Sequence, residues 1–276
     1  MLLLLEIGVK FSLYLTTLTT IGLGIHAAIG LPQQRRLLLT LALSLPMLKA
    51  VHLLLLNAQL SGDLASVFDF SMFDWIWPLH QAQVTALLIG CLVLVISLLS
   101  RGAILGVVGG LTIAFSYGLG GHTQGIEGFS IAPALVTVHL AVAGFWFAAP
   151  ISLFPKQSTS TEVVSTNAER FGVIAIWLVP VIFLTGLATL WLLTQSFQRI
   201  LFEAYGQLLI SKLLLATIAL ALGAINHNHI SGLLKSEPNK GERLLAMSLM
   251  AEAVLFTALL VLLVCATTIT GPGESS

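Results

Sequence analysis

The chain has 276 residues, of which 57% are hydrophobic and only 9% are charged, whereas soluble domains carry roughly a quarter charged residues. This composition and a mean hydropathy of +1.00 exclude an ordinary soluble fold and indicate an integral membrane protein. Twelve basic and twelve acidic residues give zero formal net charge, so nothing points to a nucleic-acid partner. Cys91 and Cys265 lie far apart in apolar segments and make neither a disulfide framework nor a CxxC motif.

Eight apolar segments are long enough to cross a bilayer, whose core of about 30 Å requires about 20 apolar residues in a helix. We expect transmembrane helices over residues 6–30, 36–58, 75–99, 102–119, 132–154, 171–194, 206–229 and 243–269. The first segment lacks a basic leading region and is too long for a typical signal peptide, so we interpret it as the first membrane helix. The predicted fold is an all-α polytopic bundle of about eight transmembrane helices, forming a single transmembrane domain over residues 1–276.

The basic residues predict the orientation of this bundle, because loops rich in lysine and arginine stay in the cytoplasm. The loops after the first, third, fifth and seventh helices contain Arg35, Arg36, Arg101, Lys156, Arg170, Lys235, Lys240 and Arg243. The opposite side has Arg199. Both termini are therefore expected on the extracytoplasmic side. The segments PKQSTSTEVVSTNAER and SGLLKSEPNKGE on the basic side are expected to be extended loops.

Ionisable side chains within the predicted spans are candidate functional residues, since each costs about 2.5–3.5 kcal/mol on insertion scales. They are Lys49, His52, His80, His139, Lys212 and Glu252. With the predicted orientation, three of these histidines lie in the outer halves of their helices, and His122 lies in the loop just outside. Four imidazoles could therefore converge. Histidine is the commonest metal ligand and suits copper, zinc, iron and nickel alike, so the pattern predicts a metal site without choosing the metal.

Each of these histidines also has a structural interpretation. His80 follows Trp77 and Pro78 at a helix start, where an imidazole can simply form hydrogen bonds at the membrane interface. His52 and His139 lie deeper, and their alternative is a hydrogen bond to a serine, threonine or asparagine on a neighbouring helix. For His26, at the end of the first helix, we favour a structural role.

The other polar residues leave similar choices. Glu252 lies close enough to the middle of its helix to neutralise Lys49 or Lys212 in a structural ion pair. Trp146 lies seven residues after His139, two helical turns along the same face. It could line the same pocket or pack against lipid, and packing is the simpler interpretation.

Several residues follow one another in a characteristic order over roughly residues 115–270, on successive predicted helices. They are Gly121, His122, His139, Trp146, Thr185, Gly186, Tyr205, Gly206, Lys212, Asn226 and Glu252. In this order the second half of the chain resembles the copper-resistance protein D (CopD) family of bacterial inner-membrane proteins. Helices one to four match in hydropathy only. The chain departs from the family pattern at FAAP, where a glycine pair is usual, and at NHNH, where an arginine usually follows the asparagine.

The resemblance implies a multi-pass protein of the bacterial inner membrane that serves copper tolerance or copper uptake. A small periplasmic copper-binding protein of the CopC type is the implied partner. In this interpretation His122 captures the ion, and His139 with His52 or His80 binds it in the outer half of the bundle. Lys212, Glu252, Lys49, Trp146, Tyr205 and Asn226 would line the pocket or pathway. Two lysines against one carboxylate leave a formally positive interior, which should repel a cation.

Two further functions are consistent with the same residues. A b-type haem protein would use two histidines as axial ligands, and Lys49 or Lys212 would pair with the haem propionates. A proton- or anion-coupled transporter would exchange protons at Lys212 and Glu252. The chain has no P-loop, GxSxG or HExxH motif, so we do not expect an enzyme.

Overall fold

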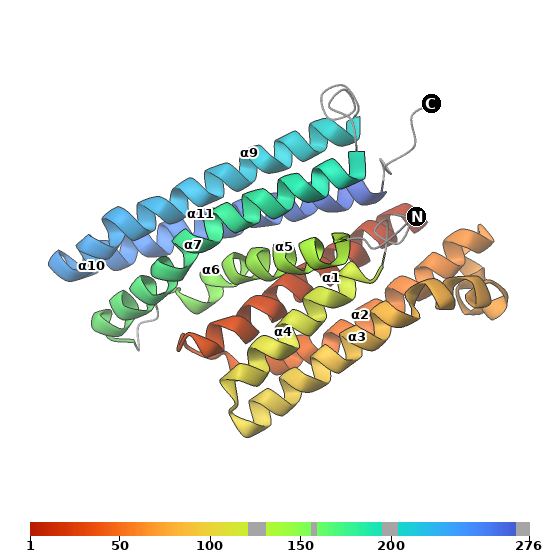
Figure 1. Ribbon diagram of the computed structural model, residues 1–276, viewed down its shortest axis with the longest axis horizontal. Coiled ribbons are helices and arrows are strands. Elements are labelled where there is room, and N and C mark those ends of the chain that lie inside the picture. Colours follow the sequence, from red (N-terminus) through yellow and green to blue (C-terminus); the bar gives the residue numbers. More distant parts are fainter. Residues whose placement is uncertain (121–130, 156–158, 195–203, 269–276) are drawn as a thin grey trace.

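The computed structural model describes residues 1–120, 131–155, 159–194 and 204–268, and within these ranges the chain forms helices and no strands (Figure 1). The principal helices are α1 (Leu2–Ala28), α2 (Arg35–Ser61), α3 (Phe73–Ser100), α4 (Ala103–Gly118), α5 (Ala132–Phe147), α7 (Thr161–Thr194), α9 (Ala204–Ile225) and α11 (Pro238–Thr268). Short helical segments are η1 (Leu64–Phe68), η2 (Phe70–Met72), α6 (Ala149–Ser152), η4 (Asn226–Ile230) and α10 (Ser231–Ser236). Among the residues that the structure describes, seven spans are long and apolar enough to cross a membrane, and α4 is a shorter apolar helix. The predicted all-α membrane bundle is confirmed.

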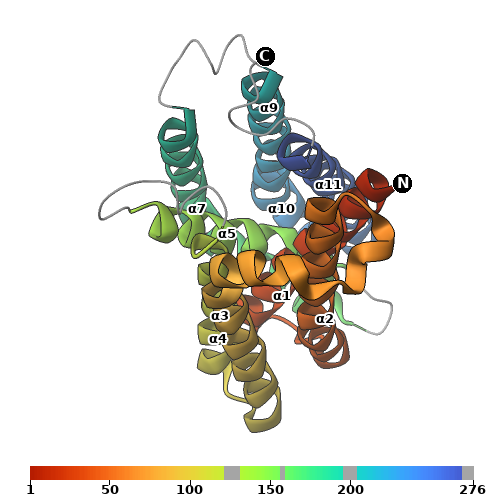
Figure 2. The same cartoon turned by 90° about the vertical axis from the view of Figure 1, so that its right-hand side faces the viewer.

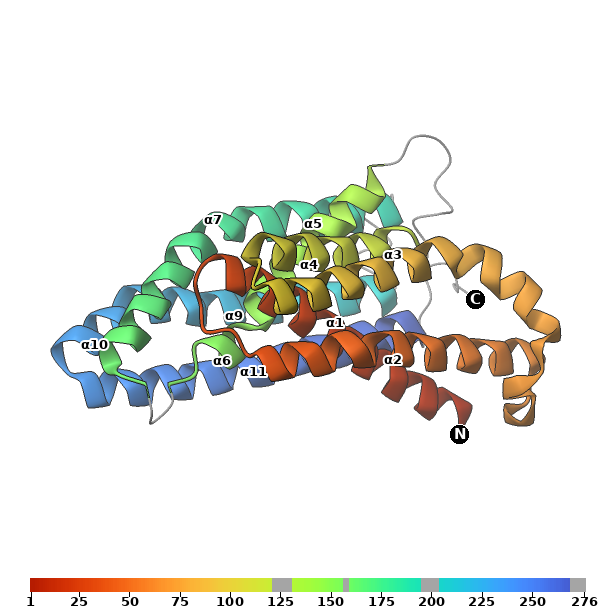
Figure 3. The same cartoon turned by 90° about the horizontal axis from the view of Figure 1, so that it is seen from below.

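Successive long helices run back and forth along one axis (Figures 1 and 3). We call the end at which α1 begins and α11 ends the terminal end; there Lys10 Nζ lies 3.2 Å from Thr268 Oγ1. The opposite end, which carries Arg35, Arg101 and Lys235, is called the basic end. Figure 3 shows α2 and α3 reaching beyond the other helices at the terminal end, where η1 and η2 join them.

Helix α1 is central, since it packs against α2, α4, α5 and α11. Figure 2, seen along the bundle, shows α2, α3 and α4 on one side of α1 and α7 and α9 on the other. Glycines allow the closest helix approaches: a Cβ added at Gly22 of α1 would lie 2.0 Å from the carbonyl oxygen of Gly144 on α5. Gly24 and Gly106 make a similar approach between α1 and α4. Such small-residue contacts are typical of membrane bundles, where close packing drives helix association.

The basic end is more helical than expected from sequence. Helix α7 begins at Thr161 and α11 at Pro238, so the segments expected to be extended loops are largely helical. Tertiary contacts stabilise these extensions: Lys235 Nζ of α10 lies 2.6 Å from Glu169 Oε1 of α7, and Thr161 donates a 2.5 Å hydrogen bond to Glu242 of α11. The expectation was wrong because polar residues were interpreted as loop, whereas helices extending out of a membrane also carry them.

Candidate functional site

The first polar group lies between α2 and α3, near the middle of α2. Lys49 is only 3% exposed, and its Nζ donates a 2.8 Å hydrogen bond to Gln83 Oε1. The same oxygen lies 3.3 Å from His80 Nδ1. His52 is close enough to Lys49 and His80 to interact with both electrostatically, while its buried Nδ1 has no hydrogen-bond partner among the described residues. Gln83 therefore joins two helices through one oxygen that accepts from Lys49 and contacts His80.

The second polar group surrounds His139 of α5. Its Nδ1 lies 3.1 Å from the hydroxyl oxygen of Thr185 on α7, and the Thr185 hydroxyl also lies 2.7 Å from the carbonyl oxygen of Val181. The neighbouring Gly186 lets the imidazole approach α7, because a Cβ at this glycine would lie 3.3 Å from Cε1 of His139. Lys212 of α9 lies within electrostatic range of His139. The ring is therefore fixed against the Thr185-Gly186 pair.

The third polar group joins η4 to α11. Asn226 Nδ2 donates a 2.7 Å hydrogen bond to Oε1 of Glu252, whose side chain is 6% exposed. Asn226 opens a π-helical turn, a distortion that is frequent at functional sites. From sequence, Glu252 is a candidate ion-pair partner for Lys49 or Lys212. In the described ranges the Glu252 carboxylate instead accepts a hydrogen bond from the Asn226 amide, and Lys49 donates a hydrogen bond to Gln83.

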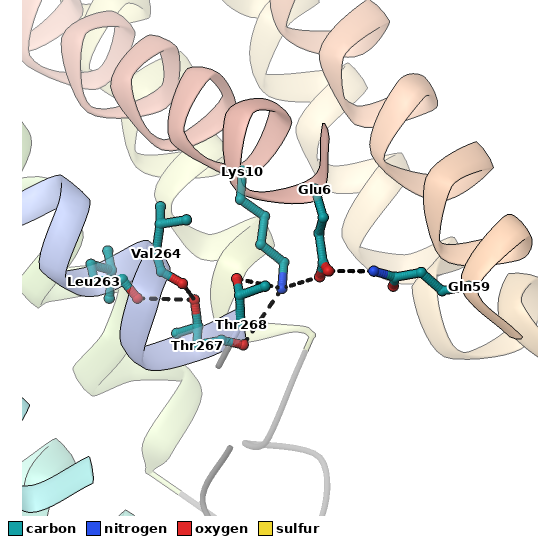
Figure 4. Close-up of polar contacts among 7 residues, drawn as sticks. All are labelled: Glu6, Lys10, Gln59, Leu263, Val264, Thr267 and Thr268. Carbon is teal, nitrogen blue, oxygen red and sulfur yellow. Dashed lines mark hydrogen bonds and ion pairs between the residues drawn. The ribbon is translucent and has the colours of Figure 1, made fainter. Parts of the chain in front are cut away.

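A further network at the terminal end was not predicted from sequence (Figure 4). Glu6 of α1 lies 2.5 Å from Lys10 Nζ and accepts a hydrogen bond from Gln59 of α2. Lys10 in turn reaches Thr267 and Thr268 at the end of α11. The i,i+4 spacing of Glu6 and Lys10 was the available signal, but nothing in the sequence indicated the partners on α2 and α11.

The predicted metal ligands thus lie in two separate places in the structure. His52 and His80 lie together between α2 and α3, whereas His139 lies between α5 and α7. His122 lies outside the described residues, so its proximity to the other three histidines stays a prediction. Within the described ranges, no group of three or more His, Cys, Asp or Glu side chains is placed to hold a metal ion.

The structure also gives the positions of three other residues that the sequence singled out. Trp146 is buried in α5 at 9% exposure, so it packs inside the bundle and not against lipid. Tyr205 belongs to the first turn of α9. Both ring nitrogens of His26 have partners, as a structural role requires: they lie 2.8 Å from Ser152 Oγ and 2.8 Å from the carbonyl oxygen of Phe145.

Comparison with known proteins supports the resemblance over one segment. Residues 166–267 match the family model of copper resistance protein D. The match includes Thr185, Gly186, Tyr205, Lys212, Asn226 and Glu252, but begins after His122, His139 and Trp146. No curated protein and no solved structure matches the chain. The resemblance to the copper resistance protein D family is thereby confirmed for the segment that forms α7, α9, η4, α10 and α11.

Proposed function

We propose that this protein moves copper ions across a bacterial inner membrane through the helices that surround His139, as a transporter without catalytic activity. The matched segment contributes Thr185 and Gly186, which hold this histidine, and relates the chain to copper resistance. For a partner we propose a periplasmic copper-binding protein of the CopC type, which would deliver the ion at the terminal end.

The hydrogen bonding of His139 is the observation that carries the proposal. A threonine hydroxyl has one hydrogen to donate, and that of Thr185 lies 2.7 Å from the Val181 carbonyl oxygen. The hydroxyl oxygen is therefore left to accept from His139 Nδ1. With the proton on Nδ1, the lone pair of Nε2 is available to a metal ion. This is the usual arrangement of a metal-binding imidazole, whose second nitrogen is oriented by a hydrogen bond.

The positive charge of Lys212 supports coupling to protons. A copper ion on His139 and a proton on Lys212 would repel each other in a medium of low dielectric constant. Copper binding would therefore favour release of the lysine proton, and departure of the ion would favour its return. Because the lysine would be neutral while copper is bound, this exchange would remove the repulsion between the copper ion and a positively charged interior. Glu252, held by Asn226, would offer an oxygen ligand near the middle of α11.

The test is copper binding and transport by the full-length protein. Copper bound to detergent-purified protein is measured by mass spectrometry, and uptake into proteoliposomes is followed with an entrapped copper chelator. We expect His139→Ala to abolish stoichiometric binding and uptake, and Thr185→Val to weaken both without abolishing them. His229→Ala is the matched control, since His229 is exposed at the basic end.

Three results would contradict the proposal. The first is unchanged copper binding and uptake in His139→Ala. The second is copper uptake without any movement of protons in the opposite direction. The third is a Soret band in the absorption spectrum that is lost in His139→Ala. The last result would make His139 a haem ligand and the protein an electron carrier.

A further inference from the structure

A second site lies outside the family match, in a pocket between α2, η2 and α3. The pocket has a volume of about 370 Å³, within the range of about 300–1,000 Å³ that is usual for small-molecule sites. Its lining is apolar and aromatic apart from one cationic group, and includes Lys49, Ala50, Phe73, Trp77, Leu87 and Leu88. We call it the α2–α3 pocket.

Lys49 determines the chemistry that the pocket can bind. Its ammonium group has three hydrogen-bond donors and no acceptor, and Gln83 takes one of them. The residue is 3% exposed and lines the pocket, so a ligand that accepts a hydrogen bond there would stabilise a charge that is costly to bury. A metal cation would instead be repelled. The complementary ligand carries an acceptor oxygen.

The depth of Lys49 limits the ligand further. With a rise of 1.5 Å per residue, Lys49 lies about 21 Å from Arg35 and about 18 Å from Ser61 along α2. It is therefore near the middle of the membrane, since half of the hydrocarbon core is about 15 Å thick. A phospholipid headgroup stays at the interface, whereas a neutral carbonyl compound dissolves in the hydrocarbon and reaches this depth.

The aromatic side chains favour a flat ring. Phe73 and Trp77 are stacked, with ring centroids 5.8 Å apart and an interplanar angle of 18°, and both line the pocket together with Phe70. Aromatic faces bind planar rings by offset stacking. We propose that the α2–α3 pocket binds a membrane-dissolved molecule of the quinone class, with a ring carbonyl accepting a hydrogen bond from Lys49 and the isoprenoid tail directed along the apolar lining.

The test uses the full-length protein in lipid nanodiscs and a short-chain ubiquinone as the probe. Quinone retained after gel filtration is quantified, and its affinity is measured by quenching of tryptophan fluorescence. The isoprenoid alcohol with the same tail controls for partition of the tail. We expect saturable binding of the quinone alone, weakened at least tenfold by Lys49→Met and by Ala50→Phe, which fills the pocket. Leu92→Phe is the matched control, because Leu92 is an exposed residue of α3 outside the pocket lining.

Equal quinone binding by the wild type, Lys49→Met and Ala50→Phe would overturn the proposal. So would binding of the alcohol that equals that of the quinone. If Lys49 instead governs retention of anionic phospholipid and not of quinone, the site belongs to a lipid and the quinone assignment is wrong. None of these results depends on copper transport, which is tested at His139.

Discussion

Asn226 donates a 2.7 Å hydrogen bond to the carboxylate of Glu252, which links η4 to the middle of α11. Loss of this donor leaves a buried acceptor without its partner, a change that costs about 1–3 kcal/mol and more when the acceptor is charged. We expect Asn226→Ala to lower the unfolding temperature in detergent, and expect further replacement of Glu252 by leucine to restore part of the loss. A thermal-unfolding double-mutant cycle measures this coupling.

The control for that cycle is Asn228→Ala, because Asn228 is an exposed residue of the same π-helical turn. If the effects of Asn226→Ala and Glu252→Leu are simply additive, the two side chains do not support each other and the predicted coupling is absent.

His26 is expected to matter for stability and not for copper. Its imidazole contacts Ser152 and the Phe145 carbonyl oxygen, and its ring plane is perpendicular to those of Phe145 and Phe171. His26→Ala leaves two buried polar groups without a partner, which costs about 1–3 kcal/mol for each. We expect a lower unfolding temperature with unchanged copper per folded chain. Parallel unfolding and metal analysis distinguish this variant from His139→Ala, and a loss of copper from folded His26→Ala protein would give His26 a role in the site.

Hydropathy was sufficient to predict the bundle, because length and apolarity alone define a membrane helix. It did not predict that α7 begins at Thr161, since the first turns of that helix lie in a polar stretch and are held by contacts with α10 and α11. Ionisable residues in apolar segments identified Lys49, His139 and Glu252 as polar-site candidates. Their partners could not be predicted, because Gln83, Thr185 and Asn226 lie on other helices and meet them only through packing.

Gly22 is expected to be essential for packing α1 against α5. A Cβ at this position would lie 2.0 Å from the carbonyl oxygen of Gly144 and 2.6 Å from Cβ of Ala148. Since backbone cannot move aside as a side chain can, Gly22→Ala should force the helices apart and reduce the yield of folded protein severely. Gly223→Ala is the matched control, because a Cβ there has open space. The measurement is the monodisperse fraction on gel filtration, and equal fractions for the two variants would refute the close approach.

The predicted orientation of the bundle rests on its basic end and can be tested by labelling. In a background with Cys91 and Cys265 replaced by alanine, single cysteines are placed at Ser71, in η2 at the terminal end, and at Ser236, the last residue of α10 at the basic end. Both positions are exposed, so each new thiol can react. Because loops rich in lysine and arginine stay in the cytoplasm, a membrane-impermeant maleimide should label Ser71→Cys in spheroplasts and Ser236→Cys only after lysis. The reverse pattern would place the terminal end in the cytoplasm and reverse the direction in which the proposed copper pathway is entered.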